Sequence, residues 1–176
     1  MELVSATGDE RFAQCASVMD VVQRIAEHNP QDRRIDQLKK TFNLTDTAVL
    51  VATVKGAIVG RRLSSMTSLV GPPPPLSKPS FFQRSKIPTV VYRVMVETLL
   101  ENGLREEAAS YVPGIAQDPG CRVEWYLRIG APIMAIEAGY EGEAPLLIET
   151  VMRKFPHHPK VQQEGEKYLR MLGGGG

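Results

Sequence analysis

The chain has 176 residues, of which 43% are hydrophobic and 23% charged, and its formal net charge is +1. These proportions are ordinary for a soluble globular protein and sufficient for one hydrophobic core without a metal or disulfide. Its two cysteines, Cys15 and Cys121, have no close-spaced partner, which argues against a zinc knuckle, a CxxC redox pair and a disulfide scaffold. Free thiols indicate the cytosol.

Membrane insertion is not expected from the sequence. The longest strongly apolar run, 48–54, is far shorter than the ~20 residues that a membrane span requires. The first ten residues, MELVSATGDE, lack the basic flank and the apolar core of a signal peptide.

The small net charge hides a segregation of charged residues along the chain. Residues 1–46 carry eight acids and six bases, 47–96 carry seven bases and no acid, and 97–176 carry twelve acids and eight bases. A basic segment of this kind projects a positive field toward an acidic partner or an anionic membrane surface. The alternative is that these charges only keep a linker solvated.

Two helices are predicted in the first 42 residues. The first runs from Asp9, a capping residue, to His28, before Asn29 and Pro30. Its apolar stripe comprises Phe12, Cys15, Ala16, Met19, Val22, Ile25 and Ala26. The second spans 32–42 with a thinner stripe, and the two should form a hairpin.

The segment 47–62 has two interpretations. Its β-branched residues around Lys55 and Gly56 are typical of two short strands joined by a tight turn. It lacks the alternation of a half-buried strand, however, and an apolar helix from Asp46 to Arg62, buried between neighbours, fits its helical surroundings. We favour the helix and leave the hairpin open.

A proline-rich linker is predicted next. From Ser64 to Lys86 the composition shifts to Ser, Pro, Thr and Gly, and 72–75 are four consecutive prolines. Such a stretch adopts polyproline-like or irregular backbone. We therefore expect an N-terminal helical part (1–63), a linker (64–87), a C-terminal helical part (88–172) and a glycine tail (173–176).

Short helices separated by glycine and proline follow to the end of the chain. A helix that Pro88 starts should end at Asn102 and Gly103. The remaining predicted helices are 104–112, 121–129, which Gly130 should end, 132–138, which Gly139 should end, a helix from Pro145 to about Phe155, and 159–172. Helices joined by such short breaks lie antiparallel to their neighbours, which predicts an all-α fold, an α-solenoid of stacked helix pairs.

Small side chains support this stacking because they let helix axes approach closely. The residues predicted at helix crossings are Ala108, Ala109, Gly130, Ala131, Ala135 and Ala138. The chain shows no strict 34-residue repeat, so a regular tetratricopeptide array is not expected.

Several segments between Asp36 and Ile148 resemble a known family. The first is 38–46, LKKTFNLTD, and the second is Lys86-Ile87-Pro88 leading to Tyr92. Others are Glu107-Ala108 with Tyr111, Arg122-Val123 with Leu127, Ile129 and Gly130, and Ala135-Ile136-Glu137. In order and spacing they resemble the C-terminal α-solenoid of the class C vacuolar protein-sorting subunit of the HOPS and CORVET tethering complexes, or its spermatogenesis-defective, VIPAR-like paralogue.

The resemblance implies a scaffold without a catalytic role. Its expected partners are a Sec1/Munc18-like protein and other tethering subunits. Contact with an anionic membrane surface is expected from the charge of the basic 47–96 segment. Its expected location is the cytoplasm, peripheral on late endosome and lysosome or vacuole membranes. A generic helical-repeat protein-binding module is the alternative.

The sequence offers little support for an enzyme, a cofactor or a metal site. None of His28, His157 and His158 has an HxxxH or HExxH spacing. The segment GAIVGRR at 56–62 lacks the GxxxxGK[ST] pattern that cradles phosphate. RNA binding through the basic 47–96 segment, with Phe81, Phe82 and Tyr92 as stacking faces, is a weaker alternative because its cations are sparse.

The candidate partner-binding residues lie mainly on the predicted helix 121–129. If Val123, Leu127 and Gly130 face the core, then Arg122, Trp125 and Arg128 fall on the opposite side. Trp and Arg are the side chains most enriched at binding hot spots. Packing of Trp125 inside the helix stack is the competing interpretation. Arg93 and Tyr111 are further candidates on the same reasoning.

Overall fold

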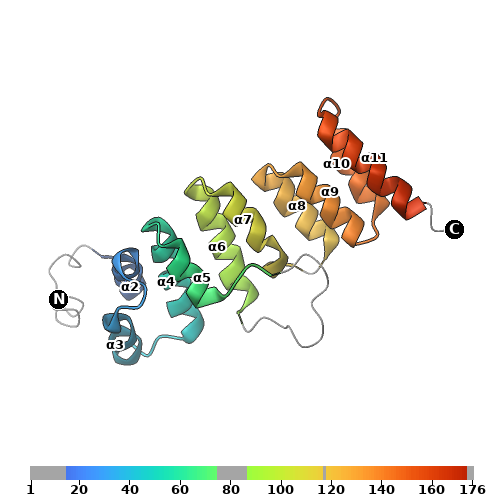
Figure 1. Cartoon of the computed structure of the whole chain (residues 1–176). Coiled ribbons are helices and arrows are strands. Elements are labelled where there is room, and N and C mark those ends of the chain that lie inside the picture. The colour runs from blue at the N-terminus through green and yellow to red at the C-terminus, as the bar shows by residue number, and fades with distance from the viewer. Residues whose placement is uncertain (1–14, 75–86, 117, 174–176) are drawn as a thin grey trace. The chain divides into compact units, whose positions relative to one another are not determined.

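The computed structural model describes residues 15–74, 87–116 and 118–173, and within these residues the chain is all-helical (Figure 1). Ten α-helices and one 3₁₀ helix are present there, and no strand, so the predicted all-α class is confirmed. The helices are α2 (Val18–His28), α3 (Arg33–Thr41), α4 (Asp46–Val59), α5 (Leu63–Val70), α6 (Thr89–Glu101), α7 (Arg105–Tyr111), η2 (Val112–Gly114), α8 (Pro119–Ile129), α9 (Pro132–Glu141), α10 (Pro145–Lys154) and α11 (Pro159–Gly173).

The chain divides into two compact units. One runs to Pro72 and includes Glu97–Gly103, and the other comprises Pro73–Val96 and the chain from Leu104 onward. Helix α6 therefore contributes residues to both units.

Helix α2 begins later than the sequence predicted. The Ser17 hydroxyl accepts a hydrogen bond from the Asp20 N–H at 3.1 Å, and Ser17 itself has extended backbone. This capping bond satisfies an N–H that the helix leaves without a partner, so the helix starts at Val18. The predicted end at His28 is confirmed, while Asp9 and Phe12 lie outside the described residues.

The core of the first unit forms where α2 meets α3 and α4. Val22, Ile25 and Ala26, which the predicted stripe included, are buried. They cluster with Val21, Ile35, Leu38 and Ala52. Helices α2 and α3 touch, as the predicted hairpin requires, and α2 also packs along α4.

Segment 47–62 is a helix, and the alternative β-hairpin is wrong. Thr45 caps α4, since its hydroxyl accepts a hydrogen bond from the Ala48 N–H at 3.3 Å. The helix ends at Val59 and not at Arg62, because the chain turns at Gly60 and Arg61 has a φ of 57°. Residues 52–54 and 56–58 are all buried, so α4 is enclosed on most of its circumference.

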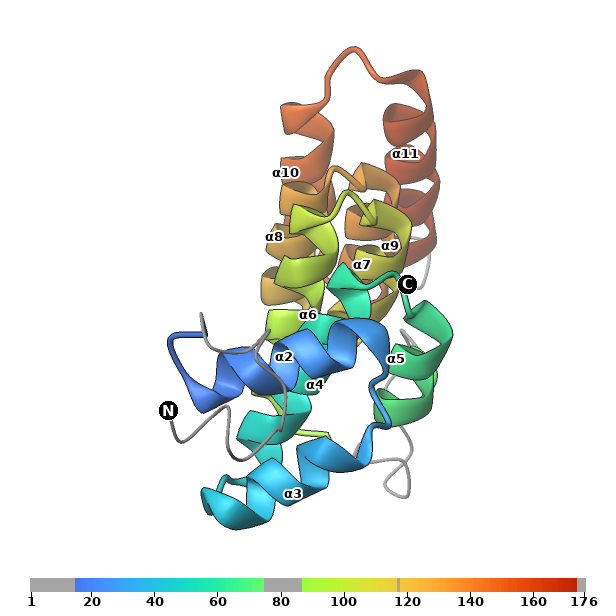
Figure 2. The same ribbon diagram turned by 90° about the vertical axis from the view of Figure 1, so that its left-hand side faces the viewer.

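Gly56 and Gly60 explain why α4 can approach α2 so closely (Figure 2). A Cβ atom at Gly56 would overlap the Gln23 carbonyl oxygen and lie 2.7 Å from the Ala26 Cβ. A Cβ at Gly60 would overlap the Glu27 carbonyl group. The two glycines therefore form a groove on α4 that receives the α2 backbone, a packing role and not a phosphate-binding one.

The first third of the predicted linker is helical. Helix α5 covers Leu63–Val70, with Met66 and Val70 buried one turn apart. Two of its hydroxyl groups bond within the helix: the Thr67 hydroxyl donates to the Leu63 carbonyl at 3.0 Å, and the Ser68 hydroxyl donates to the Ser64 carbonyl at 3.0 Å. The helix stops at Gly71, with a φ of 84°, before Pro72. Residues 75–86 of the predicted linker lie outside the described residues.

Most predicted boundaries in the second unit are confirmed because they rest on local capping. Asp118 caps α8, its carboxylate accepting a hydrogen bond from the Cys121 N–H at 2.8 Å, and Pro119 occupies the first turn. Pro145 and Pro159 begin α10 and α11. The predicted helix 104–112 is instead α7 followed by the 3₁₀ turn η2.

Two glycines of the second unit each contradict one prediction. Helix α9 does not stop at Gly139 but continues to Glu141. A Cβ at Gly139 would lie 3.0 Å from Ile148 Cγ1, so this glycine serves the contact between α9 and α10. Gly130 is exposed and has a φ of 83°, so it ends α8 in a left-handed conformation, as predicted, but it does not lie at a helix crossing.

The other predicted small residues are mostly in the core of the second unit. Ala108, Ala109, Ala135 and Ala138 are buried, and Ala131 is half-buried. Each of the last four helices touches the next along the chain, and α8 also touches α10 while α9 touches α11. Figure 2 shows α8 and α10 on one side and α9 and α11 on the other.

Candidate interaction surface

Trp125 and Arg128 lie one helical turn apart on α8 and form a surface pair. Arg128 is exposed and Trp125 is half-buried. The guanidinium carbon of Arg128 lies 4.9 Å from the centroid of a Trp125 ring, within the range of a cation–π interaction. The pair therefore presents a large apolar face beside a positive charge, and α8 holds it on a regular backbone.

Arg122 does not share this surface. It is only 6% exposed, and its Nε donates a hydrogen bond to the Ala116 carbonyl at 3.0 Å. The buried face of α8 comprises Arg122, Val123, Tyr126 and Ile129. The prediction that Arg122 points outward and that Leu127 and Gly130 define the core face is wrong, because the loop after η2 offers a carbonyl group that the Arg122 side chain satisfies.

Tyr111 is also a core residue and not a surface residue. It is 3% exposed and stacks on Tyr92, with the ring centroids 6.4 Å apart. Gly114 makes room for this stack, since a Cβ there would lie 2.6 Å from Tyr92 Cδ1. Because Tyr92 is 3% exposed, it offers no face on which an RNA base could stack. Arg93, its neighbour on α6, is exposed.

The described part of the basic 47–96 segment carries four of its seven cations. Arg61, Arg62 and Arg93 are exposed and Lys55 is half-buried. Arg61 donates a hydrogen bond to the Asn102 carbonyl at 3.1 Å. The other three cations, and Phe81 and Phe82, lie outside the described residues.

Within residues 15–74, 87–116 and 118–173, no cluster of three or more His, Cys, Asp or Glu side chains is arranged to hold a metal ion. Cys15 and Cys121 are half-buried thiols, and all three histidines are exposed. In the same part of the chain, no helix has the length and apolar character needed to cross a bilayer.

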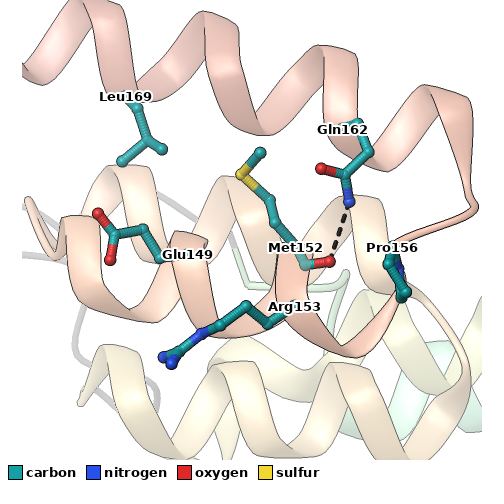
Figure 3. Close-up of a pocket in the computed structure, with 6 residues that line it drawn as sticks. All are labelled: Glu149, Met152, Arg153, Pro156, Gln162 and Leu169. Carbon is teal, nitrogen blue, oxygen red and sulfur yellow. Dashed lines mark hydrogen bonds between the residues drawn. The ribbon is translucent and has the colours of Figure 1, made fainter.

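A groove between α10 and α11 is a feature that the sequence analysis missed. It has a volume of about 480 Å³, and Glu149, Met152, Arg153, Pro156, Gln162 and Leu169 line it (Figure 3). The only signal in the sequence was Leu146, an apolar residue outside the stripe that α10 buries.

Tyr126 and Glu137 are titratable groups of the second unit whose pKa values are raised. Burial raises the pKa of Tyr126 to about 12, and its hydroxyl has no hydrogen-bond partner. Burial is also the largest cause of the raised pKa of Glu137, followed by the charge of Glu164, while Lys167 opposes the shift. Lys167 pairs with Glu164 at 2.8 Å.

Replacing Glu137 by glutamine is expected to raise the melting temperature at pH 7. A carboxyl whose folded pKa is raised stabilises the fold fully only below its unfolded pKa, near 4.5, and loses that contribution as the pH rises through the folded value. The gain of Glu137→Gln should therefore vanish below about pH 4. Melting curves across pH test this, with Glu124→Gln, at an exposed position on α8, as the control. An equal gain at all pH values would contradict it.

Comparison with known proteins finds no matching family model, no similar curated protein and no similar solved structure.

Proposed function

We propose that this chain is a non-catalytic helical scaffold that recruits a Sec1/Munc18-like protein, as part of a vesicle-tethering complex that acts in SNARE-mediated fusion at endosomes and lysosomes or vacuoles. The observation that supports it best is the Trp125–Arg128 pair, because Trp and Arg are among the side chains most enriched at binding hot spots and here they contact each other on one helix.

The proposed architecture of the second unit is a short α-solenoid. Its support is the regular contact pattern of the last four helices, in which consecutive helices touch and α8 also touches α10 while α9 touches α11. In a solenoid each helix pair contacts mainly its neighbours, which leaves an extended surface for a partner.

The segment 38–46, which carries the resemblance to the tethering subunit, builds the turn between α3 and α4. Leu38 is buried, Lys39 pairs with Asp46, and Thr45 caps α4. These contacts explain why the segment connects two helices, and they are compatible with the proposed relationship.

The proposal extends to contact of the exposed Arg61 and Arg62 with anionic membrane lipids.

The proposal predicts that a Sec1/Munc18-like protein of the same organism co-purifies with this chain and depends on the Trp125–Arg128 pair. Trp125→Ala and Arg128→Glu should each weaken binding by about 2 kcal/mol, roughly 30-fold, as truncation of a hot-spot residue does. The dissociation constants can be measured by titration calorimetry.

Arg170→Glu is the matched control, because Arg170 is exposed on α11 and its reversal changes the net charge equally. Circular dichroism establishes that each variant is folded. If no Sec1/Munc18-like protein binds, the proposed partner is wrong. If binding is as strong in the folded Trp125→Ala and Arg128→Glu chains as in the parent, the proposed surface is wrong.

A further inference from the structure

The groove between α10 and α11 is fixed by contacts across the helix pair (Figure 3). The Gln162 side-chain amide donates hydrogen bonds to the carbonyls of Met152 at 2.9 Å and Phe155 at 3.0 Å, which are acceptors at the end of α10. Gly165 lets Met152 lie against α11, since a Cβ there would be 2.6 Å from Met152 Cγ. The groove is therefore built into the hairpin and does not depend on flexible side chains alone.

An exposed leucine lies on α10, one helical turn before the groove residue Glu149. Leu146 is 72% exposed, the highest fraction among the large exposed hydrophobic residues of the described chain. It precedes Glu149 by three residues and Arg153 by seven, so all three lie on one stripe of α10. The face thus combines a protruding apolar side chain with a hollow that Met152, Pro156 and Leu169 line.

The two charged residues on this face are complementary to the same two residues of a second copy. Glu149 and Arg153 are both exposed, lie one helical turn apart, and are the charged residues that line the groove. Their charges cancel, so the groove selects neither an acidic nor a basic partner by net charge. In a two-fold arrangement, however, Glu149 of each copy can face Arg153 of the other.

We infer that the α10–α11 face is an interface between two copies of this chain. Glu149 and Arg153 of each copy pair with Arg153 and Glu149 of the other across the two-fold axis, and Leu146 of each copy then lies beside Pro156 in the groove of the other. The contact is isologous, so it closes at a dimer. Trp125 and Arg128 are not part of the groove lining, and the inference stands whether or not the proposed function is correct.

Sedimentation equilibrium of the full chain, over a loading range of about 1 to 200 µM, tests this inference because self-association depends on concentration. The parent chain should approach twice the 19.4 kDa of one copy. Leu146→Glu, at a position 72% exposed and therefore tolerant of a charge, should raise the dimer dissociation constant at least about tenfold.

Charge reversal distinguishes a two-fold contact from a non-specific one. Glu149→Arg and Arg153→Glu should each weaken the dimer, and the chain that carries both changes should recover it, because both pairs are then restored with exchanged signs. Met171→Glu is the matched control: Met171 is 53% exposed on α11, outside the groove lining, and its variant should remain dimeric.

The inference is overturned if the parent chain is a monomer throughout this range or forms an open series of larger species. It is equally overturned if the folded Leu146→Glu chain dimerises as strongly as the parent, or if the double charge reversal is weaker than both single changes.

Discussion

Gly56→Ala is expected to lower the free energy of unfolding by about 2 kcal/mol, although alanine is the better helix former by about 1 kcal/mol. Gly56 lies inside α4, and an added Cβ would overlap the Gln23 carbonyl oxygen and approach the Glu27 nitrogen to 3.0 Å. These are backbone atoms of α2, which cannot rotate away as the end of a side chain can. The cost of overpacking therefore exceeds the gain in helix propensity. The two effects change the free energy of unfolding in opposite directions, so the measured sign shows which is larger.

Urea denaturation followed by circular dichroism measures this change. Gly173→Ala is the control, because no atom lies within 4 Å of the position that its Cβ would occupy. A stabilised Gly56→Ala chain would mean that helix propensity dominates and that α4 does not approach α2 as closely as described.

Ala108→Phe should destabilise the protein by about 1 to 3 kcal/mol, toward the upper end of the range for overpacked cores. Ala108 is fully buried on α7, and that helix packs against α8 and η2. A phenyl ring at this position requires neighbouring helices to separate, and the buried Tyr111 on the same helix leaves little free volume. The melting temperature should fall accordingly.

The matched control is Glu106→Phe, which places the same side chain at an exposed position two residues earlier on α7. Its melting temperature should stay close to that of the parent. Equal melting temperatures for the Ala108→Phe and Glu106→Phe chains would show that residue 108 is not packed in a core.

Several helix ends could be predicted from the sequence because their causes lie within four residues. Asp118 bonds to the Cys121 N–H, Pro119 suits the first helical turn, and Gly130 adopts the left-handed conformation that ends α8. Such signals depend on hydrogen bonds and sterics of the local backbone. These helix ends can therefore be predicted without knowledge of what packs on the helix.

Glycine shows the limit of this reasoning. Gly130 and Gly139 were both predicted to stop helices, yet only Gly130 does so. Gly139 is buried where Ile148 of α10 approaches, and Gly56 is buried where α2 crosses α4. In these two cases the absence of a side chain serves a contact with a residue distant in sequence, which no local pattern reveals.

The sequence by itself determined the all-α class, most helix boundaries and the presence of Trp125 and Arg128 on one helix. Only the tertiary structure decided that 47–59 is helical, that α5 replaces the start of the linker, and which side of α8 is buried. Spacing on a helix fixes which residues share a face, but not which face the rest of the chain covers. Arg122 is buried because its side chain reaches the Ala116 carbonyl. That carbonyl comes within hydrogen-bond distance only when η2 packs against α8.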